Sequence, residues 1–312
     1  MLLVDGSESS LKGLLQSLPP VDEVGAHARA AMLGTRSIKT SSKRWAIDTA
    51  ISMIDLTTLE GSDTPGKVRA LCNKAVRPDP TDASVPHVGA ICVYNDMVAI
   101  ARKHLDAIGG ESIPVAAVST AFPSGRASFD VKKRDTQDAL DAGATEIDMV
   151  IDRGAFLAGD LMKVFTEIVY IKELCGDKAH LKVIFETGEL VTLDNVRKAS
   201  FLAMAAGADF IKTSTGKISP AATPPVVLVM LEAVRDFYAQ TGVKIGVKPA
   251  GGIRNTKDAI KQLVLVNETA GSEWLNPELF RIGASALLND LLMQRMKLRD
   301  GHYAGPNYVT ID

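Results

Sequence analysis

The chain has 312 residues, of which 46% are hydrophobic and 23% charged, and its formal net charge at pH 7 is −2. This composition is typical of a soluble globular protein with enough residues for one large domain or two ordinary ones. A nearly balanced charge argues against a nucleic-acid-binding surface, and the apolar runs are too short to span a bilayer. We therefore expect neither nucleic acid nor a membrane as a partner.

The N-terminus lacks the basic and then apolar pattern of a secretory signal. Three cysteines, Cys72, Cys92 and Cys175, are widely spaced and form no CxxC pair, which fits reduced thiols in a cytoplasmic protein. The five histidines are also scattered, without the spacing of a metal site. We expect no metal ion and no cofactor.

Residues 1–42 are rich in Ser, Gly, Pro and Thr and interrupt any apolar periodicity, so we interpret them as a partly helical N-terminal extension. A helix is predicted to start near Ser42. From about residue 50 onward, short apolar segments typical of strands alternate with helical patterns. The predicted strands are 52–57, 88–94, 115–120, 146–152, 180–186, 210–215, 244–250 and 280–285. The clearest predicted helices are 131–142, 161–174, 193–206, 225–240 and 256–266.

Eight alternating strand and helix units within one chain predict an α/β protein of the (β/α)₈, or TIM, barrel class. We place the barrel at residues 43–297 and a C-terminal tail at 298–312. A doubly wound open sheet is the alternative, but that fold favours a GxGxxG phosphate loop after its first strand, and the sequence has none there.

Five ionisable residues stand in or at the end of predicted strands: Asp55, Asp148, Lys182, Lys212 and Lys248. A structural ion pair would explain any one of them, since buried charges are usually paired. Segments 141–150 and 205–214 align without gaps and place Asp148 opposite Lys212, on strands four and six. Alternate strands fill the same layer of a barrel interior, so the two side chains should meet there. Such a cluster favours an active site.

The two lysines on neighbouring strands point to amine chemistry. A free lysine has a pKa of about 10.4 and is protonated at neutral pH. Burial and a like-charged neighbour both lower that pKa and release the neutral amine, which can attack a carbonyl to form a Schiff base. Asp148 would then move protons during the reaction. These features do not decide whether Lys212 or Lys248 is the nucleophile.

Glycine-containing turns follow the last three predicted strands and suggest a phosphate site. Backbone N–H groups in the loops after strands seven and eight, with a helix N-terminus, commonly bind phosphate in barrels. Lys217 would add a positive charge to that site. The turns are Ser214-Thr215-Gly216-Lys217, Ala250-Gly251-Gly252 and Gly283-Ala284-Ser285. A phosphorylated small molecule is therefore the expected ligand.

With these residues in view, the chain resembles the deoxyribose-phosphate aldolases, a class I aldolase family, and especially their longer, eukaryote-like members. The matching segments appear in family order from about residue 45 to 290. They are IDLTTL (54–59), AICVY (90–94), EIDMVI (146–151), LKVIFETGEL (181–190), KAS (198–200), GADFIKTSTGK (207–217), KPAGGIR (248–254) and RIGAS (281–285). FIKTSTGK together with KPAGGIR is highly specific.

The resemblance implies reversible cleavage of 2-deoxy-D-ribose 5-phosphate to D-glyceraldehyde 3-phosphate and acetaldehyde, a step of deoxyribose phosphate catabolism. It implies that Lys212 forms the Schiff base, that Lys248 perturbs it, and that Asp148 is the catalytic aspartate. It further implies that Lys182 and Asp55 are pocket residues. The implied phosphate contacts are Gly216, Lys217, Gly251, Gly252, Gly283 and Ser285. A homo-oligomer is compatible with the sequence, which does not fix the oligomeric state.

The sequence departs from the family pattern at a few positions. Ala286 stands where many family members have a hydroxyl residue, and Val247 stands where a Phe is common. Tyr94 is followed by Asn95 and Asp96, where the family more often has a proline after the tyrosine. Tyr303 and Tyr308 are both candidates for a C-terminal tyrosine in proton transfer.

Two alternative functions remain open. One is a phosphosugar isomerase on the same barrel, with Asp148 or Glu186 as the base. The other is a non-catalytic barrel that binds a phosphosugar. The isomerase leaves the paired lysines unexplained. Substitution of Lys212 or Asp148 would indicate the non-catalytic barrel, and both residues are present.

Overall fold

The computed structural model describes residues 4–302 and residue 305. Its centre is a sheet of eight parallel strands in the order β7-β6-β5-β4-β3-β2-β1-β8. Two isolated parallel bridges, Val247 to Phe280 and Ala250 to Gly283, join β7 to β8 and complete the barrel. The strands are β1 Ile54–Thr57, β2 Ala90–Val93, β3 Val115–Ser119, β4 Glu146–Val150, β5 His180–Ile184, β6 Phe210–Lys212, β7 Gly246–Lys248 and β8 Ile282–Ala284.

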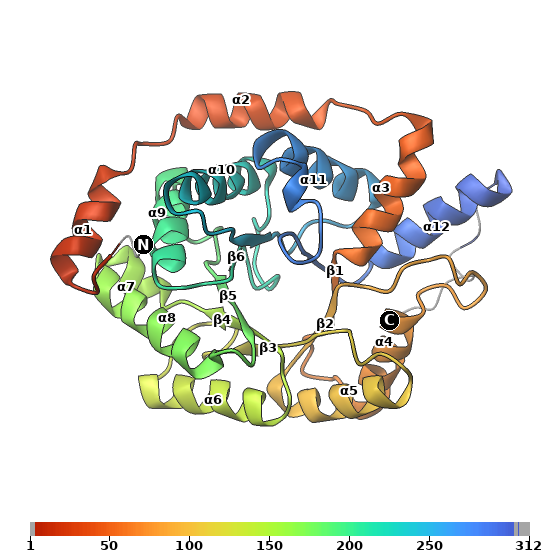
Figure 1. Cartoon of the computed structure of the whole chain (residues 1–312), viewed down its shortest axis with the longest axis horizontal. Helices are drawn as coiled ribbons and strands as arrows, with labels where there is room; N and C mark the ends of the chain where they lie inside the picture. The colour runs from red at the N-terminus through yellow and green to blue at the C-terminus, as the bar shows by residue number, and fades with distance from the viewer. Residues whose placement is uncertain (1–3, 303–304, 306–312) are drawn as a thin grey trace.

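Helices surround the strands as the sequence predicts (Figure 1). Many begin at a side-chain cap: Thr64, Thr192 and Asn255 each accept a hydrogen bond from a backbone N–H of the first turn. The helices are α4 Pro65–Val76, α5 Asn95–Ala107, α6 Phe129–Asp141, α7 Arg153–Leu157, α8 Leu161–Cys175, α9 Leu193–Ala205, α10 Pro224–Thr241, α11 Thr256–Thr269 and α12 Leu287–Asp300, with a 3₁₀ turn η1 at Ser272–Trp274. The (β/α)₈ prediction is confirmed, and the open-sheet alternative is wrong because the strands close on themselves.

Three further helices precede the barrel: α1 Glu8–Ser17, α2 Glu23–Gly34 and α3 Thr40–Ser52. They run along the outside of the molecule, where α1 contacts α9, α2 contacts α10 and α11, and α3 contacts α11 and α12 (Figure 1). The helix predicted to start near Ser42 starts at Thr40 and leads into β1. The division into 1–42, 43–297 and 298–312 stays a prediction, and both α3 and α12 run across its boundaries.

Successive strand residues point to opposite faces, and this alternation separates apolar from charged side chains. Ile147 and Met149 of β4 and Ile211 of β6 belong to the main hydrophobic core between strands and helices. The residues between or beside them, such as Asp148 and Lys212, point into the barrel and meet there. The fold thus places charge inside the barrel. No helix of the described part of the chain is long and apolar enough to cross a membrane.

Candidate active site

The side chains of Asp148, Lys212, Lys248 and Asp55 meet inside the barrel. Asp148 Oδ2 lies 2.6 Å from Lys212 Nζ and 2.7 Å from Lys248 Nζ, and Lys248 Nζ lies 2.5 Å from Asp55 Oδ2. Strand register explains the meeting of the lysines, because Lys212 of β6 is the Cα partner of Lys248 of β7. The structure therefore brings together the carboxylate and the two amines that the sequence placed on different strands.

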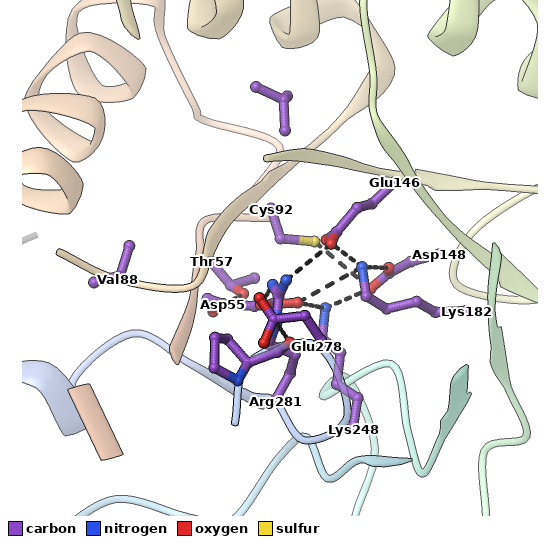
Figure 2. Close-up of polar contacts among 12 residues, drawn as sticks. Asp55, Thr57, Val88, Cys92, Glu146, Asp148, Lys182, Lys248, Glu278 and Arg281 are labelled. Atoms are coloured by element: carbon purple, nitrogen blue, oxygen red, sulfur yellow. Dashed lines mark hydrogen bonds and ion pairs between the residues drawn. The ribbon is translucent and has the colours of Figure 1, made fainter. Parts of the chain in front are cut away.

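The fifth predicted residue, Lys182, lies deeper in the same network. Its ammonium contacts Glu146 and lies 3.4 Å from Asp148 Oδ1 and 3.9 Å from Asp55 Oδ2. Glu146 and Arg281, which the sequence reasoning missed, complete the network (Figure 2). Both are charged residues at or next to the start of a predicted strand, where a charge also fits an exposed strand end, so the signal was weaker for them than for Asp148.

The electrostatics keep both aspartates ionised. Burial by itself opposes a carboxylate charge, but Lys212, Lys248 and Lys182 hold the pKa of Asp148 well below its usual range. Lys248 and Arg281 likewise outweigh burial at Asp55 and lower its pKa. Asp148 is thus an anion that accepts hydrogen bonds from both lysine side chains, a suitable position for proton transfer.

The same environment separates the two lysines. Burial lowers the pKa of Lys212, and the charge of Lys248 lowers it further, while its one carboxylate partner, Asp148, acts in the opposite direction. Lys248 is also buried, but Asp148 and Asp55 together raise its pKa well above the usual value. These environments therefore make Lys212 the more readily deprotonated of the two amines and keep Lys248 a cation.

A cavity of about 380 Å³ opens at the carboxyl ends of β1, β6, β7 and β8. Lys212 is the lysine of the network that lines it, whereas Lys248 has no solvent-exposed surface and does not line it. Access to the cavity thus distinguishes the two lysines, which the sequence alone could not do. The lining residues are Thr57, Thr58, Leu59, Glu60, Lys67, Lys212, Thr215, Gly216, Lys217, Ala250, Gly251, Gly252, Ile253, Arg254, Gly283, Ala284, Ser285, Ala286 and Leu287.

The glycine turns supply backbone donors to this cavity. Across residues 4–302, the N–H groups of Gly216, Gly251, Gly252 and Ser285 have no protein acceptor. Gly251 has φ +82°, and a Cβ there would lie 2.8 Å from the Cβ of Ala221, so a larger residue would strain the turn. The first turn of α12 adds its positive dipole end to the same wall. These features suit a phosphate group.

Gly283 differs from the other cavity glycines. Its N–H is already donated to the carbonyl of Pro249, at 2.9 Å. A Cβ at this position would lie 2.9 Å from the Cβ of Ala250 and 3.4 Å from Cε of Lys248. Gly283 thus leaves room for the Lys248 side chain, whereas its predicted phosphate contact stays a prediction.

Lys217 lies at the mouth of the cavity, where its ammonium is 2.9 Å from Glu60 Oε1. Both side chains are partly exposed, unlike those of the interior network. Glu60 and Arg254 line the cavity but were not among the predicted site residues. Neither interrupts an apolar strand, so the criterion that found the interior charges could not find them.

Glu186 and Cys92 also lie near the site. Glu186, at the end of β5, is buried, has φ +56° and accepts hydrogen bonds from the backbone and hydroxyl of Thr215. It therefore orders the loop that carries Gly216 and Lys217. Cys92 is buried with Sγ 3.9 Å from Asp148 Oδ2, and burial raises its thiol pKa, so the thiol stays neutral. Tyr303 and Tyr308, the candidates for proton transfer, lie outside the described residues.

The departures at Val247 and Ala286 have simple structural outcomes. Val247 of β7 is fully buried in the hydrophobic core between the strands and the helices. Its side chain therefore points away from the charged network inside the barrel. Ala286 lines the cavity and precedes the first residue of α12. Among the described residues, no three His, Cys, Asp or Glu side chains are placed to hold a metal ion.

The closed barrel, the interior lysines and the cavity at the strand carboxyl ends define the class of the protein as a (β/α)₈-barrel enzyme. A family model described as DeoC/LacD family aldolase matches residues 49–293. The human protein named deoxyribose-phosphate aldolase is 48% identical over 277 residues, 85% of this chain and 86% of that protein. The mouse protein of the same name is 47% identical, over 86% of each chain. This chain belongs to the DeoC/LacD family of aldolases.

Solved structures agree with the fold. A crystal structure of a protein titled a putative deoxyribose-phosphate aldolase from Coccidioides immitis matches with a TM-score of 0.65 and 27% identity, over 86% of this chain and 97% of that one. The family assignment and the fold comparison thus point in the same direction.

Proposed function

We propose that this chain is a class I aldolase that reversibly cleaves 2-deoxy-D-ribose 5-phosphate to acetaldehyde and D-glyceraldehyde 3-phosphate. The observation that carries the proposal is the position of Lys212. Its amine is buried, its pKa is lowered, and it lines a cavity whose other wall presents free backbone N–H groups. An aldehyde at one end and a phosphate at the other fit this arrangement, and the human and mouse relatives bear the name of that activity.

In the proposed reaction the neutral amine of Lys212 attacks the substrate aldehyde and forms a carbinolamine. Loss of water gives a protonated imine. Removal of the proton from the C3 hydroxyl then lets the C2–C3 bond break, with its electron pair moving into the imine to give an enamine. The phosphorylated triose leaves, and the enamine is protonated at C2 and hydrolysed, which releases acetaldehyde and the free amine.

Asp148 and Lys248 have complementary roles in this proposal. Asp148 accepts and returns protons next to the reacting nitrogen, since its Oδ2 is within hydrogen-bond distance of both amines. Lys248 stays charged and disfavours a second positive charge at Lys212. Asp55 holds Lys248 and lies next to Lys182; both are buried and neither lines the cavity, so their expected place in the substrate pocket stays a prediction.

The phosphate would be held by the loops after β6, β7 and β8. The N–H groups of Gly216, Gly251, Gly252 and Ser285, which have no acceptor in the described part of the chain, provide donors, and the ammonium of Lys217 adds charge.

Two alternatives explain less of the site. A phosphosugar isomerase needs one base and gives no role to a neutral lysine at the cavity wall. A non-catalytic binding barrel gives no role to the acidic and basic groups held against each other out of reach of solvent.

Borohydride reduction in the presence of acetaldehyde tests the mechanism. The imine should be trapped as an ethyl group on Lys212, found by peptide mass spectrometry, and substrate should protect the same lysine. Lys212→Ala should show neither trapping nor cleavage while keeping the circular dichroism of the fold. Lys132, a buried lysine paired with Glu167 outside the barrel, is the matched control and should stay unmodified. Ethylation at Lys248 alone would contradict the assignment.

We further propose that the protein works in the cytoplasm on this small phosphosugar, without nucleic acid or membrane. A homo-oligomer stays a prediction. Light scattering, which measures the molar mass in solution, tests this prediction.

A further inference from the structure

Six charged groups inside the barrel form a closed ring in which positive and negative alternate (Figure 2). Arg281 Nη2 lies 3.1 Å from Glu146, and Glu146 contacts Lys182. The contacts then run from Lys182 to Asp148, from Asp148 to Lys248 and from Lys248 to Asp55, and Arg281 Nη1 closes the ring at 2.7 Å from Asp55. Every member is at least nine-tenths buried.

Three cations and three carboxylates make this ring neutral as a unit. Lys212 is a seventh group attached to it, and among residues 4–302 its one carboxylate partner is Asp148. That carboxylate is already shared with Lys248 and Lys182. A proton on Lys212 would therefore leave one uncompensated positive charge in the barrel, which burial penalises strongly.

We propose that this ring makes Lys212 the neutral amine of the network, and that Glu146 and Arg281 are positioning residues that act on it through the ring. The proposal rests on the proposed aldolase function and deepens it. Neither residue lines the cavity, so each acts without touching substrate. The nucleophile is thus tuned by charges beneath it as well as by Lys248 beside it.

Other charges near Lys212 do not alter this count. From β2 comes Cys92, a neutral thiol, and the inward residues of β3, Ala116 and Val118, carry no charge. Glu186, at the end of β5, is turned toward Thr215 and lies 3.8 Å from Arg153. At the cavity mouth, Glu60 and Lys217 neutralise each other, and Lys67 is paired with Asp63. Arg254 also lines the cavity, but it is exposed to solvent, which screens its charge.

Changing the ring charge in opposite directions tests the proposal. Glu146→Gln removes a negative charge, so protonation of Lys212 becomes harder and its pKa should fall. Arg281→Met removes a positive charge, so that pKa should rise. Because the amine must be neutral to react, the acidic limb of the pH profile of kcat/KM should move to lower pH in Glu146→Gln and to higher pH in Arg281→Met. One charge within a buried cluster shifts a neighbouring pKa by on the order of one unit.

Three further variants separate charge from packing. Glu146→Gln combined with Arg281→Met restores a neutral ring, so its pH profile should return to within a few tenths of a unit of the wild type. Arg281→Lys keeps the charge and should do the same. Glu167→Gln breaks a buried ion pair of similar burial between α6 and α8, outside the barrel, and should leave the profile in place whatever it does to stability.

A second readout does not depend on aldol cleavage. The rate at which 4-nitrophenyl acetate acetylates Lys212, followed by peptide mass spectrometry over a pH series, reports the fraction of neutral amine directly. It should show the same two opposite shifts. If cleavage of deoxyribose phosphate is absent but the acetylation profiles move as stated, the substrate proposal fails and the ring proposal stands. Profiles that stay fixed in soluble, folded Glu146→Gln and Arg281→Met, or that move in the same direction, would overturn the ring proposal.

Discussion

The barrel interior and the cavity mouth carry charge in contrasting ways. In the interior, Lys248 and Asp148 are inaccessible to solvent and each contacts more than one opposite charge. At the mouth, Lys217 and Glu60 form one partly exposed pair, and backbone N–H groups of the glycine turns provide further donors. Buried charges interact strongly and shift each other's pKa, whereas exposed pairs are screened and contribute little. The interior therefore suits bond-making chemistry, and the mouth suits reversible binding of an anionic group.

This contrast predicts that interior substitutions change kcat and mouth substitutions change KM. Among variants that keep the Lys212 amine, the largest effect is expected at Asp148→Asn. The variant removes the group that transfers protons next to Lys212, so kcat should fall by roughly 10²–10⁴-fold. KM for deoxyribose phosphate should change far less, because the phosphate loops are intact. Steady-state kinetics, with circular dichroism to verify folding, give the measurement.

Loss of one carboxylate also leaves the interior cations less compensated. Breaking a buried pair in this way costs about 3–5 kcal/mol of folding free energy. Urea unfolding should show this loss of stability for Asp148→Asn. Glu167→Gln is the control, because it breaks a buried ion pair outside the active site, and its loss of unfolding free energy can be compared directly. An Asp148→Asn variant that lost affinity for substrate but kept its kcat would contradict the division between interior and mouth.

The sequence was sufficient to predict the eight strands because barrel strands are buried on both faces and therefore form short apolar runs between turns. It also predicted the meeting of Asp148 and Lys212, since alternate strands share layers of the interior. Glu146 and Arg281 escaped prediction because each stands near the start of its predicted strand, where a charged residue is equally compatible with an exposed end. Their contacts depend on how the barrel closes across β1 and β8.

The choice between the two lysines was also beyond the sequence. Lys212 and Lys248 each end an apolar strand and precede a glycine turn. They differ in depth and in their partners, because Lys248 reaches Asp55 while Lys212 lines the cavity. Such differences arise from strand register and from the room that Gly283 leaves for Lys248, and neither is visible in local sequence.

At the mouth, Lys217→Met should weaken phosphate binding without impairing the chemistry. A charge-assisted contact at a partly exposed site is worth about 1 kcal/mol, which corresponds to roughly a 5–10-fold rise in KM for deoxyribose phosphate. The kcat should stay within about twofold, since Lys212 and its partners are untouched. Kinetics with 2-deoxyribose, which has no phosphate, provide the control, and its KM should change much less. An equal loss with both substrates would show that Lys217 acts on the reaction centre instead.

The smallest and most specific effect is expected at Glu60→Gln. Glu60 holds Lys217 at 2.9 Å and places a negative charge at the cavity mouth, so it competes with an incoming phosphate for the same ammonium. Removing that charge should lower KM for deoxyribose phosphate, by about two- to fourfold because the pair is exposed. The gain should shrink as salt increases, since the interaction is screened. It should also vanish in a Lys217→Met background, where no ammonium is left to release. A rise in KM in Glu60→Gln would mean that Glu60 orders Lys217 for binding rather than competing for it, and the mouth would then depend on a fixed ion pair, as the interior does.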